Sequence, residues 1–312
     1  IRSLPEADAR SMTRGFARFH DLDPDRVIAG NGTTWFIYTL PLALGVKKAV
    51  IAGPTYSDYA DACRMHGVVS ELYPAGPENS FLPDIDHLDE QAGQADLVFI
   101  CNPNNPTGAL IEKEKIEHLL RRHPDTVFVI DESYLPFVET ADEISLVSDD
   151  GYANLIVLSS MSKIFRIPGL RTGFLTASLP LTGRIMAHYQ PWSVNSLAQA
   201  VIRDIFNHPE RIEPFYQQTR AFIQKEKAVF LDELSGIRGI ELFDSAAYFI
   251  LARLRSRIRS KTFCAGVGRS KLLIRDCANF DGLSDEYVRF SLKERETNIR
   301  LVRAVKAVIG HE

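Results

Sequence analysis

The sequence predicts an α/β protein: a large, doubly wound, mostly parallel sheet of seven strands, followed by a smaller α+β part. Over the first two thirds of the chain, short apolar runs alternate with helical stretches, as in a parallel sheet with helices between its strands. Several runs are apolar without alternation, which is typical of strands buried on both faces. The pattern changes near Asn207. We therefore expect a large domain over residues 1–206 and a small one over residues 207–312.

The elements follow from these runs in chain order. The seven strands are expected at residues 27–29, 49–52, 69–73, 97–101, 127–131, 155–160 and 172–177. Helices are expected among them at residues 34–44, 58–66, 113–122 and 184–188. The C-terminal part begins with a long amphipathic helix at residues 211–234 and ends with a helix from about 294 to 309. Between these helices we expect strands at residues 240–243, 248–254, 272–275 and 287–292.

Composition excludes several classes of protein. The 312 residues are 45% hydrophobic and carry a net charge of −4 without a basic block, which disfavours nucleic acid and anionic membranes as partners. The four cysteines form no Cys-x-x-Cys pair, so we expect neither disulfides nor a metal site, and a reducing, cytoplasmic location. No apolar run could span a bilayer and no signal peptide is visible. The chain starts without methionine, and we expect an N-terminal segment to precede it.

A lysine at the end of a strand is the most informative single feature. The run at residues 155–158 leads into Ser160, Ser162 and Lys163, and Arg171 follows eight residues after the lysine. An amine at the carboxyl edge of a sheet can form a Schiff base, while hydroxyls and a guanidinium can hold a phosphate. This combination suggests pyridoxal phosphate (PLP). The alternative is a Ser-Lys pair on a surface turn, which is common.

Two further turns follow strands. Gly30-Asn31-Gly32-Thr33-Thr34 opens a helix, where free N–H groups can bind phosphate, but it matches neither a dinucleotide fingerprint nor a P-loop. A plain strand–helix turn with a threonine N-cap is the alternative. Tyr56 comes after the second strand, where its ring could stack on a planar cofactor. A half-buried aromatic residue at a helix start would look the same.

The stretch Asn102-Pro103-Asn104-Asn105-Pro106-Thr107-Gly108 directly follows a buried strand. Its prolines and glycine predict a rigid turn, in which an amide can donate a hydrogen bond to a phenolate oxygen. A surface turn explains the prolines and the glycine but not the whole string, so we favour a functional role.

Three charged residues on strands also need partners. Asp131 ends a buried strand, where an unpaired carboxylate is costly, and a protonated pyridine nitrogen would pair with it. The alternative role for Asp131 is a helix N-cap. Arg275 ends one strand and Arg289 lies inside another, and arginine is suited to a carboxylate or a phosphate. The alternative for each arginine is a surface ion pair.

The order of these motifs along nearly the whole chain resembles the fold-type I PLP-dependent aminotransferases of class I/II. Within that class it is most similar to the group of histidinol-phosphate aminotransferases and threonine-phosphate decarboxylases. The resemblance implies that Lys163 bonds to the cofactor and shuttles a proton, that Asp131 pairs with the pyridinium nitrogen, and that Tyr56 stacks on the ring. It also implies a homodimer whose site is completed across the interface.

The other implied roles concern the cofactor's oxygens and the substrate. Asn105 and Tyr134 would hydrogen-bond the phenolate oxygen. The implied phosphate ligands are Gly32, Thr33, Thr34, Ser160, Ser162 and Arg171. Arg289 would hold the substrate's α-carboxylate, and Arg275 is a second candidate for an anionic substrate group.

Two positions depart from the family pattern. Trp35 stands where the family usually has glutamate. Leu4, in Arg2-Ser3-Leu4-Pro5, stands where the family has a tyrosine that reaches the neighbouring subunit's cofactor phosphate. We expect one phosphate hydrogen bond to be missing and PLP to bind less tightly. We expect the family's N-terminal arm, which would precede this point, to be missing from this chain.

Two stretches outside the cofactor motifs favour decarboxylation as the predicted reaction. The stretches at residues 36–41 and 273–283 resemble the threonine-phosphate decarboxylase branch. The best prediction is an enzyme similar to L-threonine-O-3-phosphate decarboxylase. A histidinol-phosphate aminotransferase or a related class I/II aminotransferase is the alternative. A non-catalytic PLP-binding module of a regulator is a more distant one.

Overall fold

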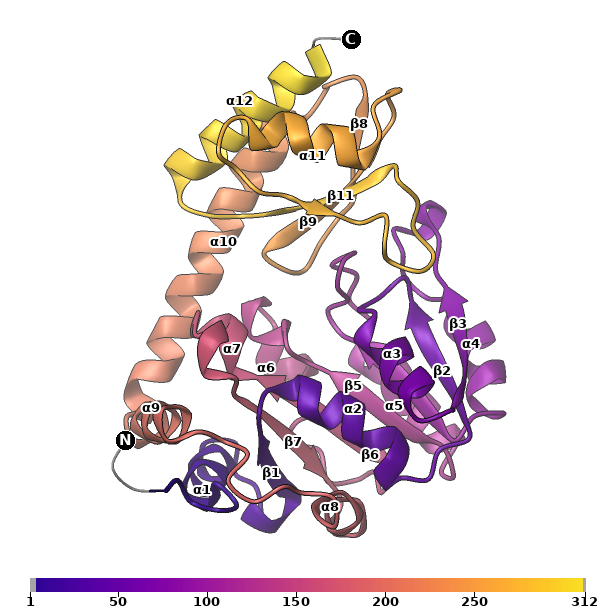
Figure 1. Ribbon diagram of the computed structural model, residues 1–312, viewed down its shortest axis with the longest axis vertical. Coiled ribbons are helices and arrows are strands. Elements are labelled where there is room, and N and C mark those ends of the chain that lie inside the picture. The colour runs from indigo at the N-terminus through magenta and orange to yellow at the C-terminus, as the bar shows by residue number, and fades with distance from the viewer. Residues whose placement is uncertain (1–3, 311–312) are drawn as a thin grey trace.

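The computed structural model describes residues 4–310 of the chain. It contains a seven-stranded sheet and a four-stranded sheet. The long helix α10 (Ile212–Leu234) runs along one side of the molecule and leads from the large sheet to the small one (Figure 1). The predicted fold class is confirmed.

All seven predicted strands form the large sheet. In spatial order they are β1 (Val27–Gly30), β7 (Gly173–Ala177), β6 (Leu155–Ser160), β5 (Val127–Asp131), β4 (Leu97–Cys101), β2 (Lys48–Gly53) and β3 (Val69–Pro74). The five strands from β6 to β3 run parallel, whereas β7 is antiparallel to both of its neighbours. The carboxyl ends of β4, β5 and β6 therefore meet at one edge, where ligands of such sheets bind.

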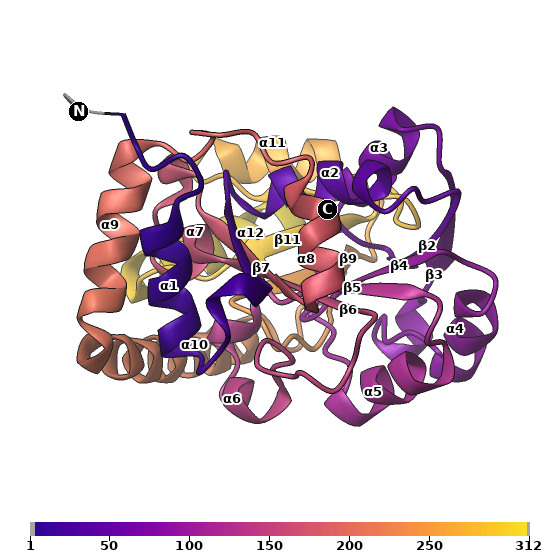
Figure 2. The same ribbon diagram turned by 90° about the horizontal axis from the view of Figure 1, so that it is seen from below.

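Helices cover both faces of this sheet. Figure 2 shows α2 (Thr33–Ala43), α3 (Asp58–Met65) and α8 (Leu179–Met186) on one side. On the other side lie α4 (Ile85–Ala92), α5 (Lys113–Arg122) and α6 (Ala141–Ile144). The remaining helices of this part are α1 (Arg10–Phe19), α7 (Met161–Ile164) and α9 (Ser196–Asn207). Short 3₁₀ helices lie at Pro24–Arg26, Pro77–Asn79, Leu135–Phe137, Pro168–Leu170 and Pro209–Arg211.

The small sheet is antiparallel throughout. Its order is β10 (Arg275–Asp276), β11 (Tyr287–Ser291), β9 (Phe249–Leu254) and β8 (Ile240–Leu242). Helices α11 (Ser260–Gly268) and α12 (Arg295–Gly310) pack beside it (Figure 1). Phe290 joins this layer to α10 and α11 through Phe230 and Phe263, with ring centroids 5.7 and 6.4 Å away. The predicted division of the chain after residue 206 falls near the end of α9 and stays a prediction.

Some predicted bounds were wrong. Helix α8 begins five residues before the expected start at 184, because Pro180 near its N-terminus fits the first turn of a helix. The strand expected at 272–275 is reduced to Arg275–Asp276, and Leu273 is 99% exposed. Helices α4, α9 and α11, and the single turns α6 and α7, lie outside the expected helix ranges. Two of them carry N-cap signals, since the side chains of Asp84 and Asn195 accept from backbone N–H groups in the first turn.

Within residues 4–310, no helix is both long enough and apolar enough to cross a membrane.

Candidate functional site

A cavity of about 370 Å³ opens at the carboxyl edge of the large sheet and reaches the small sheet. Its size is in the range of small-molecule sites. All the site residues predicted from the sequence line this one cavity: Gly32, Thr33, Thr34, Tyr56, Asn105, Asp131, Tyr134, Ser160, Ser162, Lys163, Arg171, Arg275 and Arg289. The fold thus brings together residues separated by up to 257 positions in the chain.

Lys163 lies in the single turn of α7 that follows the end of β6. Its Nζ atom is 5.6 Å from the centre of the Tyr134 ring. Although the residue is exposed to the open cavity, the surrounding protein desolvates the amine and lowers its pKa, and the charges of Arg289 and Arg171 lower it further. Asp131 opposes this effect. An amine with a lowered pKa is more often uncharged and therefore nucleophilic.

Asp131 is 4% exposed at the end of β5. Its Oδ1 accepts from the backbone N–H of Ser133 at 3.0 Å, and its Oδ2 accepts from the hydroxyl of Tyr59 at 2.8 Å. Burial raises the pKa of this carboxyl, while the hydrogen bonds from Ser133 and Tyr59 and the charge of Lys163 oppose the rise. The carboxylate therefore has donors that favour its ionised form and still faces the cavity.

The start of α2 forms the anion-binding end of the cavity. Gly32, rather than a threonine, is the N-cap, and no side chain caps the helix, so its first N–H groups remain available. Gly32 has a φ of 78°, and a Cβ there would lie 2.7 Å from Nη2 of Arg171. A Cβ on Gly173 would likewise lie 2.7 Å from the backbone nitrogen of Thr33. Two glycines thus let the guanidinium and β7 approach the helix start closely.

The three asparagines of the predicted turn have different surroundings. Asn102 exchanges two hydrogen bonds with the backbone of Ile111, and Asn104 bonds Pro54 and Thr107. Both side chains hold the turn in shape. Asn105 lines the cavity, and its Oδ1 accepts from Nη1 of Arg289, which leaves the amide N–H₂ for another acceptor.

The two predicted arginines lie directly opposite each other on neighbouring strands, Arg275 on β10 and Arg289 on β11. Like charges in this arrangement repel. Cζ of Arg289 lies 4.6 Å from the centre of the Phe249 ring, and its Nε is buried without a hydrogen-bond partner. Cζ of Arg275 lies 5.2 Å from the centre of the Phe280 ring. An anion between the arginines would relieve both the repulsion and the unsatisfied donor.

Five lining residues were missed by the sequence reasoning: Ser57, Tyr59, Cys101, Ser133 and Phe280. A signal existed for two of them. Tyr59 follows Tyr56 by about one helical turn, and Cys101 ends β4 directly beside Asp131 in the sheet register. The hydroxyl of Ser133 is buried without a partner and, like Nε of Arg289, is free to meet a ligand.

The two departures from the family pattern lie away from this cavity lining. Trp35 is half-buried on α2, with its ring 4.9 Å from Phe36 and 5.4 Å from Tyr189. Leu4 is 78% exposed, and Arg2 and Ser3 lie outside the described residues.

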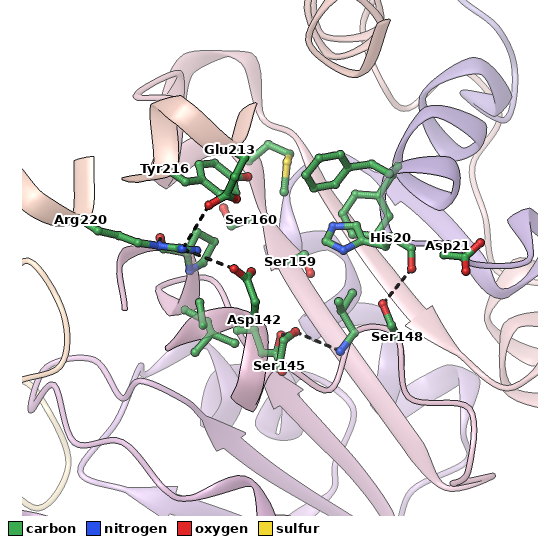
Figure 3. Close-up of a pocket in the computed structure, with 18 residues that line it drawn as sticks. His20, Asp21, Asp142, Ser145, Ser148, Ser159, Ser160, Glu213, Tyr216 and Arg220 are labelled. Atoms are coloured by element: carbon green, nitrogen blue, oxygen red, sulfur yellow. Dashed lines mark hydrogen bonds and ion pairs between the residues drawn. The ribbon is translucent and has the colours of Figure 1, made fainter. Parts of the chain in front are cut away.

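A second cavity, of about 400 Å³, shares only Ser160 with the first among its described lining residues. Arg220 points toward Asp142 and Glu213 in it, at 3.5 and 3.8 Å (Figure 3). This cavity holds none of the other predicted residues. We therefore place the candidate active site in the cavity that contains Lys163.

The chain matches the family model of aminotransferases class I and II over residues 4–305. It is 30% identical to the adenosylcobalamin biosynthesis bifunctional protein CobDQ of Leptospira interrogans, over 97% of this chain and 35% of that protein, so it spans about a third of that relative's length. Two solved structures are similar to it. The histidinol-phosphate aminotransferase from Clostridium acetobutylicum has a TM-score of 0.91 and 28% identity, covering 100% of this chain and 92% of that one. The L-threonine-O-3-phosphate decarboxylase from Porphyromonas gingivalis has a TM-score of 0.86 and 30% identity, covering 99% and 91%.

The family model covers almost the whole chain, and members of this family use pyridoxal phosphate. The chain belongs to the aminotransferase class I and II family of enzymes.

Proposed function

We propose that this chain is a PLP-dependent enzyme that acts on a small phosphorylated amino compound, with decarboxylation of L-threonine-O-3-phosphate as the first candidate. The arginine pair carries this proposal. Arg275 and Arg289 face one cavity with Lys163, and two cationic forks suit a substrate that has two anionic groups beside its amine. Threonine phosphate offers a carboxylate and a phosphate.

The lining residues fit each part of the cofactor. Asp131 would pair with the ring nitrogen, Tyr56 would lie against the ring, and Asn105 with Tyr134 would bind the phenolate oxygen. The phosphate would be held by the backbone at Gly32, Thr33 and Thr34, together with Ser160, Ser162 and Arg171. When bound, the cofactor acts as an electron sink for bonds at the substrate's α-carbon.

The chain's own residues would then govern which bond breaks. Nζ of Lys163, with its lowered pKa, would accept or donate a proton at the α-carbon. Arg289 would orient the α-carboxylate relative to the ring, because the bond held perpendicular to the ring plane is the one that weakens. Arg275 would hold the second anionic group and so fix the substrate's other end.

Histidinol-phosphate transamination is the second candidate, supported by the similarity to the aminotransferase structure. Histidinol phosphate has one anionic group, but glutamate, its amino-group partner, has two. The same arginine pair would therefore serve the second half of that reaction, and an assay has to separate the candidates.

The purified chain should be supplied with PLP and offered each substrate separately. Carbon dioxide release from threonine phosphate without 2-oxoglutarate supports decarboxylation. Glutamate-dependent turnover of imidazoleacetol phosphate, without such release, rejects it in favour of transamination. Lys163→Ala should abolish turnover and the visible absorbance of the lysine-bound cofactor. Lys115→Ala, which changes an exposed lysine on α5, should retain both. A wild-type chain that is colourless after incubation with PLP and removal of the free cofactor would overturn the cofactor assignment.

A homodimer and a cytoplasmic location stay predictions. The dimer is checked by light scattering at micromolar concentration, where the mass of a single 35.0 kDa chain would count against it.

A further inference from the structure

Tyr59 lines the cavity beside Asp131. It comes from α3, and its hydroxyl crosses to the end of β5 to donate to Oδ2 of Asp131 at 2.8 Å. The side chain is fully buried, and its ring stacks on Phe99 of β4, with centroids 4.9 Å apart and planes at 19°. Packing therefore fixes where the hydroxyl points.

This hydrogen bond joins the Tyr59 phenol, which keeps its proton, to the Asp131 carboxyl, which must be ionised to pair with a protonated ring nitrogen. Burial raises the pKa of the Tyr59 phenol well above its ordinary value, and the charge of Asp131 adds to the rise. The phenol therefore stays an O–H donor throughout the neutral range. A hydrogen bond to the ionised form of a carboxyl favours that form. Tyr59 thus opposes the effect of burial on Asp131, which alone would favour the protonated acid.

We propose that Tyr59 is a positioning residue of the cofactor site, whose hydroxyl holds Asp131 in one orientation and in its ionised form. This inference rests on the proposed role of Asp131 as the partner of the cofactor's ring nitrogen. Without Tyr59, Oδ2 would lose its donor, and Asp131 would keep the Ser133 N–H on Oδ1.

Other groups around Asp131 must be considered in any pH dependence. Lys163 faces it from α7, the thiol of Cys101 lies beside it on β4, and Glu132 follows it in the chain. Tyr56 and Tyr134 also lie within range of its charge. These groups are present in the wild type and in a Tyr59 variant alike, so a comparison between the two isolates the loss of one hydroxyl.

The test is Tyr59→Phe, which keeps the ring and its stacking on Phe99. PLP affinity is measured by titration of the apo chain at pH 6, 7 and 8. A hydrogen bond to a charged group predicts a loss on the order of tenfold or more, largest at pH 6, because Asp131 is protonated more readily in the variant. Tyr216→Phe is the matched control. It removes a hydroxyl from a buried tyrosine outside this cavity and should leave the affinity unchanged.

Unfolding of the apo chains gives a readout that does not need the cofactor. An acid whose folded pKa is raised destabilises the fold as pH increases, so Tyr59→Phe should lose more stability at pH 8 than at pH 6. The two defects therefore have opposite pH trends. An affinity equal to wild type at every pH, or a loss that does not vary with pH, overturns the positioning role. If wild type binds no PLP while the stability trend holds, the cofactor assignment fails and the Tyr59–Asp131 coupling stands.

Discussion

Glu132 offers a stability test whose magnitude follows from its surroundings. The residue is 5% exposed, next to Asp131, and both carboxylate oxygens are hydrogen-bonded, to the hydroxyl of Ser145 at 2.6 Å and to the N–H of Leu146 at 2.7 Å. Burial nevertheless raises its pKa from 4.5 to about 7. Between these pH values the folded chain holds a proton that the unfolded chain releases. The free energy of unfolding therefore falls as pH rises through this window.

The size of the effect comes from the shift itself. A change from 4.5 to about 7, at about 1.4 kcal/mol per pKa unit, corresponds to about 3 kcal/mol. Glu132→Gln removes the titration and keeps an oxygen that can accept from Leu146. The variant and the wild type should differ little in stability at pH 5, whereas at pH 8 the variant should be more stable by up to about 3 kcal/mol.

The assay is urea unfolding at pH 5, 6, 7 and 8 without added cofactor, with Glu143→Gln as a control at an exposed position on α6. Asp131 titrates in all three proteins, and its charge adds to the rise in the pKa of Glu132, so the curves report on the Glu132–Asp131 pair. The expected result is a stability difference that grows with pH for Glu132→Gln and stays flat for Glu143→Gln. Parallel curves for wild type and Glu132→Gln would refute the assignment of a raised pKa to this buried group.

Two further pairs of substitutions, each a test with its control, concern the turn that ends at Gly108 and the arginine pair. Gly108 has a φ of 77°, and a Cβ there would meet Oγ of Ser245 at 2.0 Å, so Gly108→Ala should cost more than about 2 kcal/mol in urea unfolding. Gly45→Ala is the control, because Gly45 has a φ of 59° but open space around it, and it should lower the free energy of unfolding by about 1 kcal/mol. Equal losses of stability in the two variants would contradict the steric argument. Arg289→Lys should lower kcat/KM about 100-fold for whichever substrate the enzyme turns over, because the lysine amine cannot make the paired hydrogen bonds of a guanidinium. Arg255→Lys, at an exposed ion pair, should change it little, and a similar loss in both variants would argue against a substrate contact.

Much of the site could be predicted because it lies where strands end. Asp131 ends β5 and Lys163 follows β6, and in a parallel sheet the carboxyl ends of neighbouring strands share one edge. Local sequence was enough to place both residues near each other. Gly32 could be singled out for the same reason. A positive φ and a close approach of a neighbouring side chain both favour glycine at that position, and the local sequence before the helix shows it.

The contacts that sequence reasoning missed connect distant segments. The hydroxyl of Tyr59 reaches Asp131 across 72 positions, and nothing in the string around Tyr59 specifies its partner. The pairing of Arg275 with Arg289 depends on the register of β10 and β11. The expected strand at residues 272–275 overlaps the observed strand β10 at Arg275 alone. A register cannot be read from the sequence when one strand is two residues long and neither of its residues, Arg275 and Asp276, is buried.

The charge of the cavity then constrains what it can hold. Among the described residues that line it, three are arginines, namely Arg171, Arg275 and Arg289, Lys163 is an amine with a lowered pKa, and Asp131 is the one carboxylate. A phosphate monoester carries nearly two negative charges near neutral pH, but the cofactor's phosphate would lie beside Arg171 and would leave Arg275 and Arg289 without an anion of their own. The arginines opposed on the small sheet would then repel each other, and Arg289, which is half-buried, would keep a buried Nε without a partner. An anionic substrate completes the balance, and for this reason a doubly anionic amino compound fits the site better than a neutral amine.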